Sequence, residues 1–286
     1  MEWIHKRTIM IVGLGLIGGS YARALRRLGY RVEAIDTNAD AIRYALDHGI
    51  IDAGYTDVEA DALGSADAVI FALYPGTLLR WIGENQHLLK EGAMLTDVTG
   101  VKSCIVYDVQ KMLRPDLEFI AAHPMAGREV SGVENSDDRI FRDANYIVVP
   151  TEKNTEQGIL WCRELGQILG FAHISELTPE EHDDMIGFVS QLTHCIAIAL
   201  MTCSENRHLA DYTGDSFRDL TRIARINDRM WSELFLRNKE PLLRQMDTFL
   251  REFKQLRDLL SEEDAQGLRE KMRLSTERRG YFDKQA

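Results

Sequence analysis

The sequence predicts an α/β fold, with a parallel-sheet domain in residues 1–176 followed by an all-helical domain in residues 177–286. Short apolar runs alternate with helical patterns up to about residue 176, as expected when helices cover both faces of a parallel sheet. Beyond that point no convincing strand remains, and apolar residues recur at the spacing of helices. A length of 286 residues suits two such domains.

The chain begins with a predicted strand, a glycine motif and a helix. Residues 8–12 are a continuous apolar run, which is typical of a strand buried on both faces. The motif GLGLIG follows at residues 13–18. In such a motif Gly13 permits the tight turn, Gly15 lets the backbone approach a pyrophosphate, and Gly18 lets helix and strand pack closely. Free N–H groups at the start of the next helix would bind the phosphates.

An acidic residue ends the second predicted strand, residues 31–35. Asp36 lies about 20 residues beyond the glycine motif, where a carboxylate accepts hydrogen bonds from a ribose diol. Asp36 would repel a 2′-phosphate, and Thr37 and Asn38 supply no arginine to receive one, so NAD is favoured over NADP. The first domain is therefore predicted to be a Rossmann-type NAD-binding domain. The predicted cofactor-binding residues are Gly13, Gly15, Leu16, Ile17, Gly18, Asp36, Thr37, Tyr74 and Pro75.

The rest of the first domain continues the alternation of strands and helices. We expect strands at 68–73, 93–96, 117–122, 145–150 and 171–174, and helices at 39–48, 101–113 and 156–169.

A capping box opens the second domain, because Thr178 is a good N-cap, Pro179 suits the first helical position and Glu181 completes the motif. We expect helices at 179–206, 216–226, 230–237, 239–260 and 262–278. The fourth helix carries a heptad-like apolar seam. The seam consists of Leu242, Met246, Phe249, Phe253, Leu256 and Leu260. Packing within the chain and contact between two subunits of a dimer would bury this seam equally well.

Composition narrows the class of partner and compartment. The formal net charge of −11 argues against nucleic acid and anionic membranes as partners. No run of 18 apolar residues is present, so we expect no membrane span. Residues 1–7 lead directly into the first strand, so we expect no signal peptide. The four scattered cysteines suit a reducing cytoplasm and predict neither a metal site nor disulfides.

His123 is the strongest catalytic candidate, because it follows a predicted strand at the edge where open α/β sheets bind ligands. Pro124 fixes the turn after it and Gly127 permits close approach of the backbone. The alternative is a half-buried structural histidine. Ser190 and His194 lie one helical turn apart and share a face, which would line a site or form a polar stripe in a bundle.

Four arginines form a second candidate feature, at spacings of four, three and four residues. They are Arg218, Arg222, Arg225 and Arg229. A charged stripe is usually a solvated helix face. In an acidic protein it is also what an anionic substrate needs, since the guanidinium fork binds a carboxylate through two hydrogen bonds. His182, near the start of the same domain, is interpreted as a structural residue.

Together these motifs resemble the prephenate dehydrogenase (TyrA) family. The matching tracts span nearly the whole chain, and the HPMAG tract with the acid and Ser-Gly pair that follow it is the most specific. These tracts are Gly13–Ser20, Asp97–Lys102, His123–Gly127 with Glu129 and Ser131-Gly132, Thr178–Asp183, Ser190–His194, Phe217–Ala224 and Met230-Trp231.

The resemblance implies an NAD-dependent oxidative decarboxylation of prephenate to 4-hydroxyphenylpyruvate in tyrosine biosynthesis, by a cytoplasmic homodimer joined through its helical domain. It implies that His123 accepts the substrate hydroxyl hydrogen bond, that Arg222 binds a carboxylate, and that Ser190 and His194 line the pocket. Many relatives carry a serine where this chain has Gly100, and Thr99 is the expected substitute for its hydroxyl. The catalytic set is thus predicted to be His123, Ser190 and Thr99, with Arg222, His194 and Gly127 binding substrate.

Three alternatives stay open. Arogenate dehydrogenases perform the same chemistry on an ammonium-bearing substrate, for which an acidic residue in the pocket would be needed. β-Hydroxyacid dehydrogenases use a lysine on the second-domain helix, and residues 179–206 contain none. A non-catalytic NAD-sensing protein would need only the glycine motif. We also expect a monofunctional chain, without the chorismate mutase or regulatory domains that some relatives carry.

Overall fold

The structure is a computed structural model that describes residues 8–283, so the expectation about a signal peptide in residues 1–7 lies outside the described residues. The chain divides into two compact units, one ending at Asn238 and the other beginning at Lys239. The first unit holds the α/β region and the helices that follow it as far as Asn238.

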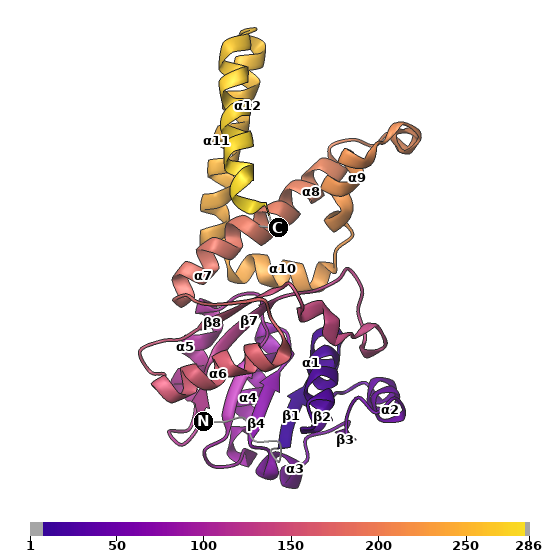
Figure 1. The fold of residues 1–286 in the computed structure, drawn as a ribbon, viewed down its shortest axis with the longest axis vertical. Coiled ribbons are helices and arrows are strands. Elements are labelled where there is room, and N and C mark those ends of the chain that lie inside the picture. Colours follow the sequence, from indigo (N-terminus) through magenta and orange to yellow (C-terminus); the bar gives the residue numbers. More distant parts are fainter. Residues whose placement is uncertain (1–7, 284–286) are drawn as a thin grey trace. The chain divides into compact units, whose positions relative to one another are not determined.

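A six-stranded sheet forms the centre of the first unit, and all of its neighbouring strands are parallel (Figure 1). This confirms the predicted fold class. The order is β3-β2-β1-β4-β5-β6. The strands are β1 (Thr8–Val12), β2 (Arg31–Ile35), β3 (Ala53–Tyr55), β4 (Ala68–Phe71), β5 (Met94–Asp97) and β6 (Glu118–Phe119). The sequence did not predict β3, because three edge residues are too short a run to show a pattern.

Alternate residues of β1 point to opposite faces of the sheet, and each face has its own core. Ile9 and Ile11 pack in one cluster with residues of α1 and α6, while Met10 and Val12 pack in the other with residues of α3, α4 and α5. All four side chains are buried. The helices are α1 (Leu16–Arg27), α2 (Ala39–Asp47), α3 (Ala60–Ser65), α4 (Pro75–Asn85), α5 (Ser103–Met112) and α6 (Glu156–Leu169).

A second, three-stranded sheet corrects the prediction for residues 117–122. These residues do not form one strand: β6 ends at Phe119 and β7 (Ala121–Met125) joins another sheet, in the order β7-β8-β9. β7 pairs antiparallel with β8 (Asn145–Val149), which pairs parallel with β9 (His173–Glu176). Pro124 fits β7 because an edge strand tolerates the missing N–H group. His123 therefore lies within an edge strand, opposite Ile147, and does not end a parallel strand.

The helices of the second half of this unit are shorter than expected. The predicted capping box is present at the start of α7 (Pro179–Ile186), but a π-helical segment at Gly187–Leu192 precedes α8 (Thr193–Thr202). The predicted helix 216–226 ends early, because α9 (Asp215–Thr221) passes into a 3₁₀ turn at residues 222–224.

The arginine stripe is consequently not one helix face. A new helix, α10 (Asp228–Arg237), begins after Asn227, whose side chain caps it by accepting a hydrogen bond from the amide of Met230. Arg218 lies on α9, Arg222 starts the 3₁₀ turn and Arg229 lies on α10. The regular spacing in the sequence thus spans three different elements.

One described segment is long and apolar enough to cross a membrane when judged by length and composition alone. It is Pro179–Thr202, with a mean hydropathy of 1.6 in its most apolar window, 28% of which is buried. Phe188, Val189 and Met201 are among its exposed apolar residues. The expectation that no segment spans a membrane remains a prediction.

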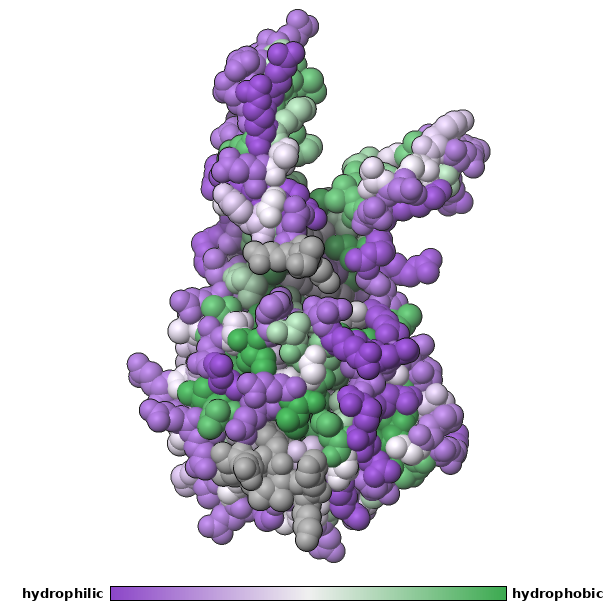
Figure 2. Space-filling view, viewed as in Figure 1, coloured by the Kyte–Doolittle hydropathy of each residue, from purple (hydrophilic) through white to green (hydrophobic). Residues whose placement is uncertain are grey.

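The second unit is a helical hairpin of α11 (Lys239–Ser261) and α12 (Ala265–Arg279). Lys271 of α12 donates to Glu252 and Gln255 of α11, at 2.7 and 3.0 Å. Two residues of the predicted seam are well exposed, Phe253 at 61% and Leu260 at 67%, and Figure 2 shows apolar surface along this hairpin. Packing within the described hairpin therefore leaves these two residues of the seam exposed.

Candidate active site

The glycine motif has the geometry that its sequence predicts. Gly13 has a φ of +97°, and a Cβ atom there would overlap the carbonyl oxygen of Ala72. A Cβ at Gly18 would overlap the carbonyl oxygen of Gly13, so neither position tolerates a side chain. Gly15 is exposed, and no atom lies within 4 Å of the place that its Cβ would occupy. The loop is thus tightly packed beneath and open above, as close approach of a phosphate requires.

The residues around the motif fit a dinucleotide. Leu16 and Ile17 form the first turn of α1, whose N-cap Gly15 has no side chain to occupy the free N–H groups. Asp36 accepts hydrogen bonds from the amides of Leu14 at 2.6 Å and Asn38 at 2.8 Å. Each carboxylate oxygen has a second lone pair, so Asp36 retains acceptors for a ribose diol. Thr37 is exposed beside it.

The predicted cofactor residues Tyr74 and Pro75 lie at the start of α4 and meet α10. Pro75 occupies the first turn of α4. The amide of Gly76 donates to Glu233 Oε1 at 2.7 Å, and Asn227 Nδ2 donates to the Tyr74 hydroxyl at 3.3 Å. The turn between β4 and α4 is therefore held by the helix that follows the arginine-rich segment.

His123 is half-buried on β7, with its Nδ1 atom 2.9 Å from Nε2 of His182. The Nε2 edge of His123 faces Gly100. A Cβ atom added to Gly100 would lie 3.8 Å from His123 Nε2 and 3.6 Å from Leu234 of α10. Burial holds the pKa of His123 well below 6.5, and repulsion from a protonated His182 or from Lys102 would lower this pKa further. The imidazole is therefore neutral near pH 7 and can accept a proton.

A buried ion pair lies behind this strand. Lys102 Nζ donates to Asp97 at 2.7 Å, to the carbonyl of Ala122 at 2.5 Å and to the Thr99 hydroxyl at 3.2 Å. The side chains of Lys102 and Asp97 are fully buried. Asp97 also accepts from the amide of Ala122 at 3.2 Å, so the pair joins β5 to β7.

The structure places the Thr99 hydroxyl in this network and not beside His123. Its hydroxyl donates to Asp97 and lies 3.0 Å from the carbonyl of Val101. Among the described residues no hydrogen bond joins Thr99 to His123. The hydroxyl is instead committed to the buried charges, and Gly100 leaves the edge of His123 without a neighbouring side-chain hydroxyl from this segment.

Other predicted residues meet on the helical side. His194 stacks on Trp231 with ring centroids 3.7 Å apart, and its Nδ1 donates to the carbonyl of Ser190 at 2.9 Å. Arg222 forms an ion pair with Glu129 from the loop that follows β7. Burial lowers the pKa of His194, with the charges of Glu129 and Arg222 acting in opposite directions, so these groups are near one another.

Of the remaining candidates, Gly127 is exposed, with no atom within 4 Å of its Cβ position. Sequence reasoning noted Glu129 and Trp231 only as part of the family resemblance and assigned them no role in the site. It also missed the pairing of His123 with His182, because these contacts join distant segments. Within residues 8–283 no group of three or more His, Cys, Asp or Glu side chains is placed to hold a metal ion.

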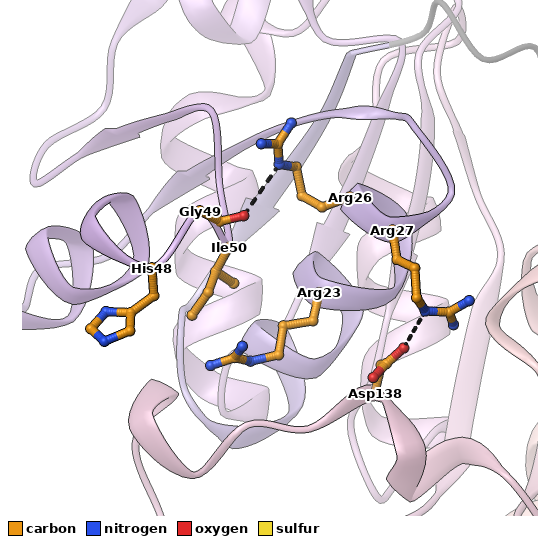
Figure 3. A pocket seen from close by; sticks show the side chains of 7 residues that line it. All are labelled: Arg23, Arg26, Arg27, His48, Gly49, Ile50 and Asp138. Carbon is orange, nitrogen blue, oxygen red and sulfur yellow. Dashed lines mark hydrogen bonds and ion pairs between the residues drawn. The ribbon is translucent and has the colours of Figure 1, made fainter.

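A pocket of about 410 Å³ lies elsewhere, at the C-terminal end of α1 (Figure 3). Arg26 pairs there with Asp52 and Arg27 with Asp138, both at 2.6 Å, while Arg23 donates to Ser136 at 2.8 Å. Its arginines are thus already engaged, and the pocket adjoins the opposite end of α1 from the glycine motif.

Two family models match the chain. The prephenate dehydrogenase nucleotide-binding domain matches residues 21–169, and the prephenate dehydrogenase dimerization domain matches residues 178–274. The chain belongs to the prephenate dehydrogenase family. Its first domain is accordingly a nucleotide-binding domain, in agreement with the geometry of the glycine motif.

Individual proteins agree with this assignment. Prephenate dehydrogenase of Bacillus subtilis (strain 168) is 33% identical over 271 residues, 92% of this chain and 72% of that protein. Cyclohexadienyl dehydrogenase of Zymomonas mobilis is 28% identical over 280 residues, which are 95% of this chain and 94% of that protein. The Aquifex aeolicus prephenate dehydrogenase structure with hydroxyphenyl propionate and NAD+ superimposes with a TM-score of 0.90 at 31% identity, covering 99% of this chain and all of that one.

Proposed function

We propose that this chain is a prephenate dehydrogenase that converts prephenate and NAD+ to 4-hydroxyphenylpyruvate, CO2 and NADH in tyrosine biosynthesis. The observation that carries the proposal is a neutral His123 with its Nε2 edge toward Gly100 and its Nδ1 edge hydrogen-bonded. The Aquifex aeolicus structure with NAD+ and a hydroxyphenyl ligand supports the choice of cofactor and ring.

Each protein group has one task in this reaction. The glycine motif and Asp36 would hold NAD, which when bound supplies the acceptor for the hydride of the hydroxyl-bearing ring carbon. His123 Nε2 accepts the hydrogen bond of the ring hydroxyl and draws off its proton as the C–O bond gains carbonyl character. The ring becomes aromatic as CO2 leaves the opposite carbon, and His123 returns the proton to the phenol oxygen. Arg222 binds a carboxylate of the substrate through its guanidinium fork.

A second candidate substrate is arogenate, and Glu129 is the observation that favours it. Arogenate carries an ammonium group, which an acidic residue in the site would bind. Glu129 pairs with Arg222 and lies near His194, so it is placed among the expected substrate-binding residues. The relative from Zymomonas mobilis, a cyclohexadienyl dehydrogenase, is a further reason to test both substrates.

We also propose that the enzyme is a cytoplasmic homodimer joined through its helical domain. The matching dimerization-domain model supports this assembly, as do the exposed seam residues Phe253 and Leu260 and the exposed apolar face of Pro179–Thr202. The free cysteines of the structure suit a reducing compartment.

The direct test mixes the purified protein with NAD and either prephenate or arogenate and follows the absorbance of NADH. We expect NADH with prephenate and a lower kcat/KM with arogenate. Glu129→Gln should reduce any arogenate activity more than prephenate activity. A protein that forms NADH with neither substrate would refute the proposed function, and a preference for arogenate would replace it with the second candidate.

A further inference from the structure

We propose that His182 and Asp183 are positioning residues that hold His123 in a single tautomer, with Nδ1 protonated and Nε2 free to accept the proton of the substrate hydroxyl. The inference rests on the proposed function for its catalytic meaning, and on hydrogen-bond geometry and burial for the tautomer. Three side chains form a hydrogen-bonded row, in the order His123, His182 and Asp183. The last of them, an ionised carboxylate, can only accept hydrogen bonds.

Asp183 fixes the direction of the row. Its Oδ1 accepts from the amide of Lys102 and its Oδ2 from the amide of Ser103, both at 2.8 Å. These amides start α5, where a carboxylate also gains from the helix dipole. Burial acts to raise the pKa of Asp183, but the hydrogen bonds from His182 and the two amides outweigh it and lower the pKa. Asp183 is therefore ionised and has no proton to donate.

His182 must then donate to Asp183. Its Nδ1 lies 2.8 Å from Asp183 Oδ1, so Nδ1 carries the proton of this contact. Burial is the main cause that lowers the pKa of His182, and the ring is therefore neutral with a lone pair on Nε2. The side chain is fully buried, so water does not offer Nε2 a competing partner.

The lone pair of His182 sets the tautomer of His123. Nε2 of His182 lies 2.9 Å from Nδ1 of His123, and this contact is a hydrogen bond only if His123 Nδ1 is protonated. A neutral His123 then has its lone pair on Nε2, the edge that faces Gly100. The opposite tautomer would bring two lone pairs together in a buried contact and present a donor to the substrate hydroxyl.

The charged groups around the row change the pKa values of its two histidines. Lys102 disfavours a proton on either histidine, whereas Asp183 and Asp97 favour one on His182. When His123 takes up the substrate proton, its Nδ1–H bond to neutral His182 is kept. The carboxylate of Asp183 then faces the new positive charge through one intervening ring.

Helix α7, which carries His182 and Asp183, is anchored from a third side. Asn238 donates through Nδ2 to the carbonyl of Asp183 at 2.8 Å and to Oε1 of Gln191 at 2.7 Å. Gln191 in turn donates to the carbonyl of Leu234 at 3.2 Å. Asn238 is buried, so water does not replace these hydrogen bonds. They join the segment that carries Asp183 to the segment that carries Leu234, and both segments lie beside His123.

The experiment compares four variants of the full-length protein. His182→Leu removes both nitrogens, His182→Gln keeps a side-chain oxygen that can accept from His123, and Asp183→Asn removes the charge that orients His182. Glu180→Gln is the matched control, because it neutralises an exposed carboxylate on the same helix. Within residues 8–283 this carboxylate accepts a hydrogen bond from the Tyr107 hydroxyl. Thermal melts and NAD binding check that each variant is folded.

We expect His182→Leu and Asp183→Asn to lower kcat by about 10²-fold with KM and NAD affinity changed less than about threefold, within the range of losses for impaired acid–base catalysis. His182→Gln should recover about tenfold of the loss, and Glu180→Gln should match wild type. Wild-type kcat in a folded His182→Leu variant would overturn the inference, as would equal losses in His182→Gln and His182→Leu.

Nitrogen NMR of ¹⁵N-histidine-labelled wild-type protein decides the tautomer without any turnover. We expect His123 to show a protonated Nδ1 and an unprotonated Nε2. Protonation on Nε2 would overturn the inference even if the variants fail to fold. If the wild-type protein turns over neither prephenate nor arogenate, the proposed function fails while the NMR result still decides the tautomer.

Discussion

Replacing Arg222 by alanine tests whether this residue binds a substrate carboxylate or merely contributes positive charge. The structure offers a close control in Arg218, one turn earlier in the sequence. Arg222 is 63% exposed and pairs with Glu129, while Arg218 is 66% exposed and pairs with Asp215. Each substitution removes one positive charge from a similarly exposed side chain, so a difference between them isolates the specific contact.

The binding free energy lost in Arg222→Ala depends on how far the substrate carboxylate and the guanidinium are shielded from water. Losing one member of a desolvated, hydrogen-bonded charge pair costs roughly 2–5 kcal/mol. Arg222 is largely exposed and surface ion pairs contribute only about 0–1 kcal/mol, so we take the lowest value of the first range, about 2 kcal/mol. Because each 1.4 kcal/mol is about one decade, KM for prephenate should rise at least about tenfold.

Steady-state kinetics at two salt concentrations measures the difference. Arg222→Ala should raise KM for prephenate with little change in NAD affinity, and Arg218→Ala should stay within about twofold of wild type, as expected for a solvated surface charge. Equal increases for both variants, reduced together by salt, would mean that a diffuse field attracts the dianion. No increase for Arg222→Ala would mean that the carboxylate binds elsewhere.

Three further predictions concern the base, the cofactor and the buried ion pair. His123→Asn should lower kcat by roughly 10²–10⁴-fold; because the pKa of His123 lies below 6.5, wild-type activity should fall only at a pH well below 6.5, and this loss should vanish from the variant's pH profile. Asp36→Ala should narrow the preference for NAD over NADP, mainly through KM for the cofactor, and better use of NADP by the wild type would contradict the assignment. Lys102→Met should destabilise the fold by about 3–5 kcal/mol by leaving buried Asp97 unpaired, and an unchanged melting temperature in calorimetry would contradict the importance of this pair.

The nucleotide-binding part could be predicted from the sequence because its determinants are local. The strand, the glycine motif and the helix are contiguous, and the left-handed conformation of Gly13 and the contact of Gly18 with its carbonyl arise within that short segment. Asp36 required one further step, the pairing of β1 with β2, which a parallel βαβ unit supplies. Only the contact of Gly13 with the carbonyl of Ala72 comes from a more distant strand.

The catalytic part could not be predicted in the same way. His123 and His182 are far apart in the sequence, and their contact depends on β7 leaving the parallel sheet after Phe119. Nothing in the apolar run of residues 117–122 marks that break, since Ile120 continues the pattern of a buried strand. His182 therefore suggested only a structural residue near a helix start, although its capping box was correctly predicted.

The same limit explains the arginine stripe. The spacing of the arginines is helical, and no proline or glycine interrupts residues 216–226, so the pattern predicts one helix. The structure ends α9 at Thr221 and starts α10 with the Asn227 cap. Arg222 thus leaves the common face and reaches Glu129, a contact between loops that helical periodicity cannot foresee.

The predicted boundary near residue 176 separates the α/β region from the helical region, but hydrogen bonds near the candidate active site cross it. Asp183 accepts the first amides of α5, and Glu233 accepts the amide of Gly76 at the start of α4. In both contacts a carboxylate from the helical region satisfies backbone donors at the N-terminus of a helix of the nucleotide-binding region. Helices α7 and α10 are therefore joined by hydrogen bonds to α5 and α4 of the nucleotide-binding region, so that His123 and the glycine motif lie in one compact unit.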